Sequence, residues 1–512
     1  MAVFVARRLA VSVLTLLVAT FIVYVLVANS GDPLADLRTD QSASREDKIA
    51  ARTAALHLDE SVPQRYLIWI KGASGCVLPG AACDLGTNIR GQEVTALVSL
   101  AVASTLRLVV LAAILAIVVG ISIGVISALR QYSGLDYTTT FSAFLFYSLP
   151  VFAFAVLLKQ YVAIGFNDWL RDPKISVLTA LALAVVSGTF WGALLGGNRR
   201  RRWTVRGVAA LLTFGLLMYL SAVDWFLRPS LGPVLIAVLA FAIALGITWL
   251  IAGLQRRRVL YSALTMAAIA SVGQFAIIPF LEDKAWATWG TLLLLAVATI
   301  AVGIGVGFGL GGLDRTQAAR AAVLTGLLSG GVIIVDILLR TLPSYSRLVR
   351  GRIFATVGSN TPNFAGDFWQ TILDNAFHLV LPTIAIMLLS VATYSRYSRS
   401  SMLEVLNQDY VRTARAKGLT ERTVVVRHAF RNAMIPLATL AAIDFGAIIS
   451  GAVITEAVFA WRGMGRLFIE GLLMADPNPV MGFFIVTSVA VVVFNMLADI
   501  AYAYLDPRIR VA

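Results

Sequence analysis

Two acidic residues in an apolar stretch are the first candidates for chemistry in this sequence. Asp444 and Glu456 lie twelve residues apart within residues 435–460, which carry no other charged side chain. A charge inside a membrane-spanning helix is energetically expensive and is by default a functional hypothesis. One hypothesis places both carboxylates on a path through the membrane, where they meet a cationic group. The alternative is an interhelical hydrogen bond or a position near the membrane surface.

Sequence patterns for nucleotide and zinc chemistry are absent. The chain contains no GxxxxGK[ST] phosphate-binding loop and no HExxH zinc-protease motif. Its three histidines, His57, His378 and His428, are scattered. We therefore expect a protein that is not an enzyme and has no ATPase site, cofactor or metal of its own. Energy must then come from a partner subunit or from an ion gradient.

Both cysteines, Cys76 and Cys83, fall in the polar segment 29–99. We expect this segment outside the cell, where disulfides persist. Residues 77–82 can turn back on themselves, so a disulfide is predicted, with two unpaired thiols as the alternative. A metal site is not expected, because two cysteines with only His57 nearby are too few ligands.

The composition indicates a polytopic, all-helical membrane protein in contact with lipid. Of 512 residues, 59% are hydrophobic and 14% are charged, whereas a soluble domain has about a quarter of its residues charged. The net charge of +14 comes from arginines in short loops between apolar runs, as the positive-inside rule describes. No basic face with interleaved aromatic residues is present, so a nucleic-acid partner is not expected.

Apolar runs of about 20 residues predict about twelve spans in three consecutive regions of the chain. Residues 1–166 hold three spans, residues 167–341 hold six, and residues 342–512 hold three. The first run follows Arg7 and Arg8 and exceeds the signal-peptide length of about 7–15 residues. We read it as an uncleaved span, with both chain termini in the cytoplasm. The six outer spans are expected at 9–28, 100–129, 141–166, 377–394, 435–460 and 480–504.

The central region carries an internal repeat. Gly188, Gly246 and Gly303 head similar segments 58 and 57 residues apart, each followed by a basic turn. Three helical hairpins are therefore expected, and their even number of crossings keeps the downstream chain in its orientation. Glycines at 303, 307 and 311 form a small-xxx-small face, which predicts close helix packing.

Residues 409–436, DYVRTARAKGLTERTVVVRHAFRNAMIP, form a basic island in this apolar chain. Val411, Ala414 and Leu419 alternate with Arg412, Arg415 and Lys417 at roughly helical spacing, and Gly418 interrupts, which predicts a short helix ended by glycine. Thr420 is expected to cap a second helix, with Glu421 near its N-terminus. Such an island can be a rigid knob that a partner grips, or only a positive loop that fixes orientation.

The sequence of this island resembles the cytoplasmic coupling loop of binding-protein-dependent ABC importer permeases, in the dipeptide/oligopeptide/nickel branch. The general importer pattern is Glu-Ala-Ala followed by a glycine four residues later. Here Ala414 and Gly418 match, whereas Arg412 and Thr413 depart from it. The resemblance extends over residues 1–166 and about 345–512. It rests also on GDP at 31–33, DLGTNIR at 84–90, the turn 128–137, AWRGMGRLF at 460–468 and LDPRIR at 505–510.

The resemblance implies a type I ABC importer transmembrane domain of six helices, interrupted here by about six inserted ones. It implies a bacterial cytoplasmic-membrane protein that works with a second permease subunit, two ATP-binding subunits and an extracellular substrate-binding protein. Peptides would be the cargo, and Asp444 and Glu456 would meet their amino group. The ATPase-coupling residues would lie in the cytoplasmic loop 395–434 and the start of the next span: Asp409, Tyr410, Arg412, Ala414, Arg415, Ala416, Lys417, Gly418, Arg427, Asn432 and Pro436.

A self-sufficient secondary transporter is the alternative, because twelve spans suit that class as well. It would need two matching halves around a midplane site. The repeat is instead confined to residues 187–315, and the two flanking regions do not resemble each other.

Overall fold

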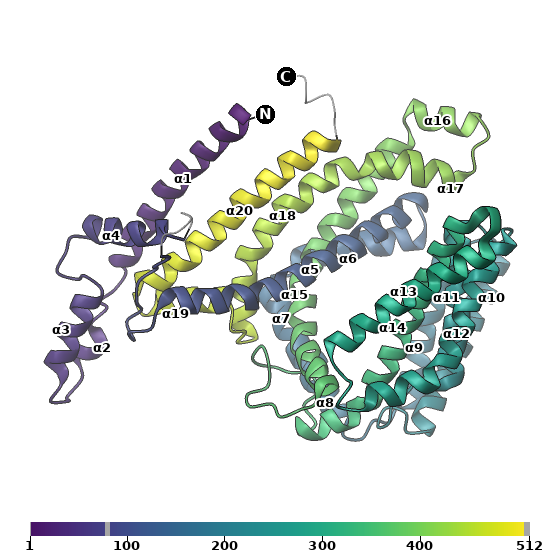
Figure 1. Cartoon of the computed structure of the whole chain (residues 1–512), viewed down its shortest axis with the longest axis horizontal. Coiled ribbons are helices and arrows are strands. Elements are labelled where there is room, and N and C mark those ends of the chain that lie inside the picture. Colours follow the sequence, from purple (N-terminus) through teal and green to yellow (C-terminus); the bar gives the residue numbers. More distant parts are fainter. Residues whose placement is uncertain (1, 77–81, 506–512) are drawn as a thin grey trace. The chain divides into compact units, whose positions relative to one another are not determined.

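The computed structural model describes residues 2–76 and 82–505, and all regular structure in them is helical (Figure 1). Contacts divide the chain into two compact units. The first contains Met1–Val162, Thr356–Ser359 and Leu379–Ala512; the second contains Ala163–Ala355 and Asn360–His378. The first unit therefore joins both ends of the sequence, and the second consists mainly of the central region.

The first unit is built around α18 (Arg431–Val458), which packs against α5 (Val94–Leu129), α7 (Val151–Leu157), α19 (Met464–Leu473) and α20 (Pro477–Leu505). Pro150 separates α7 from α6 (Gly134–Ser148), since proline cannot donate a backbone hydrogen bond inside a helix. The π-helical segment η1 (Leu158–Ile164) follows α7. The first unit also contains α1 (Ala2–Ala28), α2 (Ala35–Arg38), α3 (Arg45–Ala55), α4 (Val62–Ser74), α16 (Asp409–Ala416) and α17 (Glu421–Thr423). It holds α15 (Phe368–Leu406) from Leu379 on, and the earlier residues of α15 belong to the second unit.

The second unit contains antiparallel helix pairs. The helices are α8 (Gly165–Trp169), α9 (Val177–Leu195), α10 (Arg199–Ala222), α11 (Gly232–Ile251), α12 (Arg257–Glu282), α13 (Trp289–Gly311) and α14 (Arg315–Leu348). α9 packs on α10, α11 on α12, and α13 on α14, while α14 also contacts α11 and α12. The three hairpins expected from the repeat are thus α9–α10, α11–α12 and α13–α14.

The glycine face of α13 packs as its spacing predicts. Gly303, Gly307 and Gly311 are buried, and a Cβ atom on any of them would collide with α14, at Val323, Ala319 or Ala318. A Cβ at the alternate glycines, Gly305 and Gly309, would meet nothing within 4 Å. The prediction of close packing at 303, 307 and 311 is therefore confirmed.

An acidic residue of α14 caps α11. Asp336 is 0% exposed and accepts hydrogen bonds from the backbone N–H groups of Leu231 and Gly232, at 2.6 and 3.3 Å. It also pairs with Arg340 at 2.7 Å. Its negative charge lies where the α11 backbone leaves unpaired donors and a positive dipole end, so this intramembrane charge has a structural explanation.

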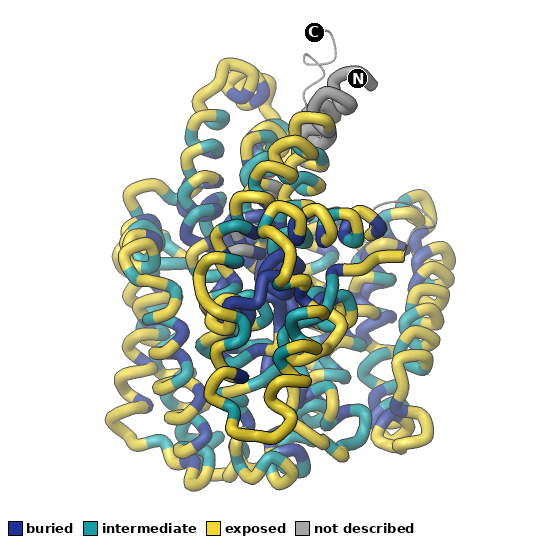
Figure 2. Tube along the Cα trace, turned by 90° about the vertical axis from the view of Figure 1, so that its left-hand side faces the viewer, coloured by how far each residue is buried: buried dark blue, intermediate teal, exposed yellow. Residues whose placement is uncertain are grey.

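Length and composition give ten candidate membrane spans among the described residues, or eleven if the bent segment through α17 and α18 counts as one. One candidate, the stretch Trp289–Leu348, contains both α13 and α14. Exposed and buried residues alternate around the long helices in Figure 2, and no residue of α10 is buried. These exposed apolar faces suit lipid, and the chain is a multi-pass membrane protein.

Candidate coupling loop and intramembrane carboxylates

The basic island folds as two short helices joined at a glycine, and it leads into the N-terminus of α18 (Figure 1). α16 ends at Ala416, and Gly418 follows with φ +76°, a conformation that L-residues rarely adopt. Its N–H donates to the carbonyl oxygen of Arg415 at 2.9 Å. The side chain of Thr420 then accepts a hydrogen bond from Thr423 N–H and caps α17. The predicted helix end and helix cap are both confirmed.

The underside of the loop is apolar and its outer side is polar. Val411, Ala414 and Val424 are buried together against Val405 and Leu406. All the other predicted coupling residues are exposed: Asp409, Tyr410, Arg412, Arg415, Ala416, Lys417, Gly418, Arg427, Asn432 and Pro436. The loop is therefore anchored through one face and leaves a basic face free for a partner.

Polar contacts connect the loop to α18. The amide of Asn432, in the first turn of α18, donates to the Tyr410 hydroxyl at 2.8 Å. Arg415 forms a two-point ion pair with Glu421, at 2.7 and 3.1 Å. This pair is exposed, so its contribution to stability is about 0–1 kcal/mol. The π-helical segment η3 (Val424–Phe430) joins α17 to α18 without a break.

The two predicted carboxylates have separate surroundings. Asp444 is half-buried in α18 and lies close to Ser390 and Tyr394 of α15. Its Oδ2 atom is buried and has no hydrogen-bond partner among the described residues. A buried acceptor without a partner is costly, which keeps Asp444 a candidate for contact with a cationic ligand.

Glu456 is 0% exposed and both of its oxygens are occupied. Thr105 of α5 donates to Oε1 at 2.6 Å, and Gly465 N–H donates to Oε2 at 2.7 Å. The Thr105 hydroxyl in turn accepts from Met464 N–H at 2.8 Å. Glu456 thus satisfies the N-terminus of α19 and joins it to α5 and α18. These contacts are those of the interhelical alternative for this residue.

Two glycines of the segment 460–468 make room for this carboxylate. A Cβ atom on Gly463 would collide with the carboxylate of Glu456. A Cβ on Gly465 would collide with Val453 and lie 2.9 Å from Glu456 Oε2. The spacing Gly463-Met464-Gly465 is therefore a consequence of the buried acid, a relation that could not be read from the sequence without knowing which segments meet.

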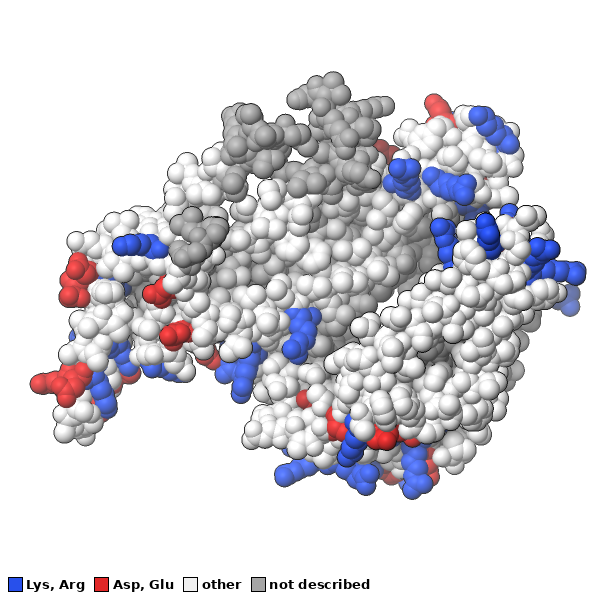
Figure 3. Space-filling model, in the orientation of Figure 1, with Lys and Arg blue, Asp and Glu red and all other residues white. Residues whose placement is uncertain are grey.

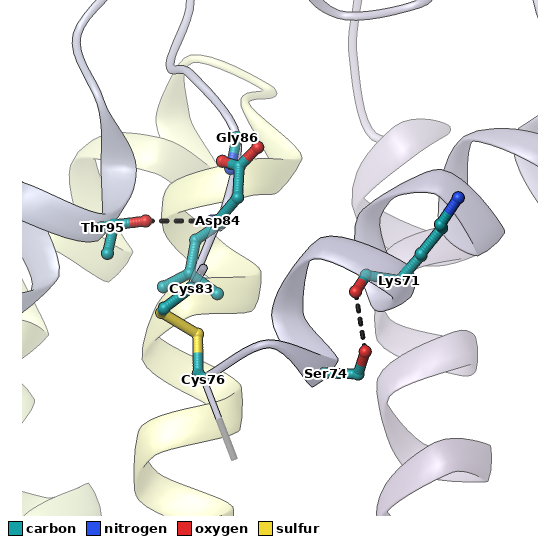
Figure 4. The surroundings of a disulfide bond; sticks show 8 residues. Lys71, Ser74, Cys76, Cys83, Asp84, Gly86 and Thr95 are labelled. Carbon is teal, nitrogen blue, oxygen red and sulfur yellow. Dashed lines mark hydrogen bonds between the residues drawn. A yellow bond between two sulfur atoms is a disulfide. The ribbon is translucent and has the colours of Figure 1, made fainter. Parts of the chain in front are cut away.

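A disulfide bond joins Cys76 and Cys83 after α4, next to the segment DLGTNIR (Figure 4). Residues 77–81 between them lie outside the described part of the chain. Beyond Asp84, Leu85 N–H donates to Thr95 at 3.0 Å, which fixes the strand-like segment on the start of α5. The disulfide therefore closes a loop at the base of this segment.

The segment DLGTNIR is hydrogen-bonded to the start of α20. Ile89 N–H donates to Asp476 Oδ2, and the Asn478 amide donates to the carbonyl oxygen of Thr87, each at 2.7 Å. Asp476 is 2% exposed, and burial raises its pKa to about 6. Sequence reasoning missed Asp476 and Asn478, because their partners are nearly 400 residues away in the chain.

Asp476 gives the first testable prediction. Because its pKa rises from about 3.9 in the unfolded chain to about 6 in the fold, protonation stabilises the folded state. This stabilisation is complete below about pH 4 and is lost as pH rises through 6, in total about 3 kcal/mol. Melting temperatures in detergent between pH 4 and 8 should show that Asp476→Asn removes this contribution. Equal pH slopes in the wild type and the variant would contradict the prediction.

A second missed acid fixes the turn 128–137. Asp136 is buried and accepts from Arg399 of α15 at 2.7 and 2.9 Å, from Ser127 and from Tyr132 N–H. The Arg399 guanidinium holds the pKa of Asp136 below its usual range. An aspartate three residues after a helix-capping Ser133 is ordinary in sequence, so only the distant arginine reveals its role.

Metal and nucleophile chemistry find no support in the described part of the chain. No three His, Cys, Asp or Glu side chains there are grouped to hold a metal ion. The sequence GISIG at 120–124 does fit the pattern of a nucleophile elbow, but it lies inside α5. Ser122 donates to the carbonyl oxygen of Val118 at 2.6 Å within that helix. The strand–turn–helix that such an elbow needs is not formed there.

Comparison with known families gives one match over most of the chain. The family described as "Binding-protein-dependent transport system inner membrane component" matches residues 188–511, which include the candidate coupling loop, Asp444 and Glu456. The chain belongs to this family. As an inner-membrane component of a binding-protein-dependent transport system, it is a transport permease in class, in agreement with the resemblance of the loop.

Curated relatives of the permease are named for peptide transport. The oligopeptide transport system permease protein OppB of Mycobacterium tuberculosis is 41% identical over 161 residues, 31% of this chain and 50% of the relative. The corresponding protein AppB of Bacillus subtilis is 43% identical over 139 residues (27% and 44%). The dipeptide transport system permease protein DppB of Escherichia coli is 42% identical over 138 residues (27% and 41%). The permease chain thus spans about half the length of the curated relatives it matches.

Proposed function

We propose that this permease is one membrane subunit of an ATP-driven importer of peptides in a bacterial cytoplasmic membrane. A second permease subunit completes the translocation path, and two ATP-binding subunits hydrolyse ATP. An extracellular substrate-binding protein delivers the peptide. Both chain termini and the basic loop lie in the cytoplasm. The names of the curated relatives and their 41–43% identity support peptides as the cargo.

The observation that carries this proposal is the geometry of the loop 409–436. Its apolar underside is anchored by Val411, Ala414 and Val424, while its basic outer face is exposed. Through η3 it continues into α18, the helix that carries Asp444. A displacement of the loop by an ATP-binding subunit would therefore reach the carboxylate through one connected segment. A loop that only fixed the orientation of the chain would need positive charge, but it would not need this helical connection to α18.

Asp444 is the residue we assign to the translocation path. Its unpaired Oδ2 atom is available to a donor, and the amino group of a peptide is such a donor. In Glu456 both oxygens already accept hydrogen bonds, so the same role is not proposed for it.

Asp444→Asn should reduce peptide uptake without disturbing assembly. A hydrogen bond to a charged group contributes about 1.5–3 kcal/mol, so the KM for uptake should rise at least about tenfold. Uptake of a labelled peptide into proteoliposomes containing the whole complex measures this. Asp283→Asn, in the exposed turn after α12, is the matched control. Unchanged kinetics in Asp444→Asn would remove this residue from the path.

Affinity purification from the native membrane in mild detergent tests the proposed assembly. Wild-type bait is compared with a double variant, Gly418→Pro with Arg415→Glu. A matched control is Gly91→Pro with Arg90→Glu, since Gly91 also has positive φ (+75°) and an arginine beside it, away from the loop. Mass spectrometry then identifies the accompanying proteins.

We expect an ATP-binding subunit and a second permease with wild type and with the control. The loop variant should lose the ATP-binding subunit and keep the second permease. A chain that purifies alone in every form, with uptake that depends on a proton gradient, would favour the secondary transporter instead.

A further inference from the structure

The three hairpin turns at one end of the second unit are strongly basic. Residues 196–206, 252–258 and 311–320 contain ten arginines and a single acid, Asp314, for a net charge of +9. The turns at the other end, 168–174, 224–228 and 282–284, contain five acids and four bases. Figure 3 shows Lys and Arg gathered near the tips of these hairpins and mixed charge at their opposite end.

Two of the basic turns are joined into one surface. Arg256, before α12, forms an ion pair with Asp314, before α14. Arg258 lies against Gly312, whose φ is +53° and where a Cβ atom would collide with the Arg258 guanidinium. Asp314 is therefore already neutralised. Arg257 and Arg315 on these turns stay exposed, as do Arg199, Arg200, Arg201 and Arg202 on the α9–α10 turn.

Apolar side chains are exposed between these arginines. Leu313 is 99% exposed at the α13–α14 turn, and Leu254 is 46% exposed at the α11–α12 turn. On the α9–α10 turn Trp203 is 61% exposed, and the Arg206 guanidinium lies 5.1 Å from the centre of its ring. Tryptophan with arginine at the end of a membrane helix is the composition of the lipid headgroup zone.

We propose that these basic turns, 196–206, 252–258 and 311–320, bind the phosphate groups of anionic phospholipids. Guanidinium groups match phosphate oxygens in a two-point geometry, and clusters of four to eight arginines beside a membrane helix attract anionic lipid. Orientation alone would require the charge but not the exposed leucines and tryptophan. These apolar groups can enter the acyl-chain boundary while the arginines hold the headgroup, which favours lipid over free phosphate as the ligand.

Lipid titration of the purified full-length chain, with the subunits that accompany it, tests the proposal. After delipidation, native mass spectrometry compares binding of phosphatidylglycerol with that of phosphatidylcholine. The test variant carries Arg199→Gln, Arg200→Gln, Arg201→Gln and Arg257→Gln, four exposed residues outside the Arg256–Asp314 pair. Each arginine beside an anionic surface strengthens binding about fivefold, so the variant should lose at least about tenfold of the preference for phosphatidylglycerol.

Two further variants keep the outcome decisive. Arg→Lys at the same four positions retains the charge and should retain most of the preference for phosphatidylglycerol. This variant keeps the proposal testable if the glutamine variant fails to fold. Arg171→Gln, Lys174→Gln and Arg228→Gln remove three of the four basic side chains at the opposite end and should bind like wild type. Equal loss in the opposite-end variant, or no lipid preference in wild type, would overturn the proposal. Displacement of the lipid by millimolar inorganic phosphate would identify free phosphate as the ligand and also overturn it.

Discussion

Gly418→Pro is expected to reduce peptide uptake more than tenfold while the chain remains in the membrane. Gly418 has φ +76° and donates its N–H to Arg415 O at 2.9 Å. Proline fixes φ near −65° and has no N–H, so it can satisfy neither condition, and such a misfit costs about 3 kcal/mol or more. The turn between α16 and α17 should open, and the exposed basic face should lose its shape. Uptake by the reconstituted complex measures the loss.

Other substitutions at this position separate backbone geometry from side-chain contact. A Cβ atom on Gly418 would meet nothing within 4 Å, so only the conformation matters. Asparagine tolerates positive φ and should keep most of the uptake, while alanine should be intermediate, at a cost of about 1–2 kcal/mol. Proline at Gly91 should leave coupling intact. If asparagine and proline impair uptake equally, the role assigned to the turn is wrong.

Among the substitutions considered, Glu456→Ala is expected to lower the free energy of unfolding the most. It leaves the Thr105 hydroxyl and Gly465 N–H buried without an acceptor and opens a cavity between α5, α18 and α19. Each buried unsatisfied group costs about 1–3 kcal/mol, so the free energy of unfolding should fall by about 3 kcal/mol or more. Gly465→Ala should have a similar effect, because its Cβ would meet Val453 and the same carboxylate. Melting temperature in detergent is the measurement.

Glu470→Ala is the control for Glu456→Ala. Glu470 lies in α19 and forms an exposed ion pair with Arg466 at 2.7 Å, which contributes about 0–1 kcal/mol. Its loss should hardly change the melting temperature. If Glu456→Gln abolished uptake with an unchanged melting temperature, the translocation-path hypothesis for Glu456 would gain support over the interhelical one.

Features with a local cause could be predicted from the sequence. Apolar runs and basic turns predicted the three central hairpins, and glycine spacing predicted the face of α13 that packs on α14. Gly418 and Thr420 predicted the helix end and cap within the loop. In each case the residues that determine the conformation are close together in the chain, or recur at the period of one helix.

Features that depend on distant partners could not be predicted. Glu456 and Asp444 look alike in sequence, yet one is bonded to Thr105 across 351 residues and the other keeps an unpaired oxygen. Asp476 is an unremarked acid until Ile89 is placed beside it. Hydrophobic patterns say which residues enter the membrane, but not which helices become neighbours, and buried polar residues take their role from those neighbours.

The bond between Ile89 and Asp476 spans 387 residues and sets an order of events during synthesis. At about 5–20 residues per second, the partner of Ile89 leaves the ribosome about 20–80 s after Ile89 itself. The central hairpins are translated within that interval. The DLGTNIR segment must therefore remain without these partners until residues 476–478 have been synthesised. Docking of this segment on the start of α20 therefore comes late in synthesis, and a nascent chain arrested before residue 476 would still lack it.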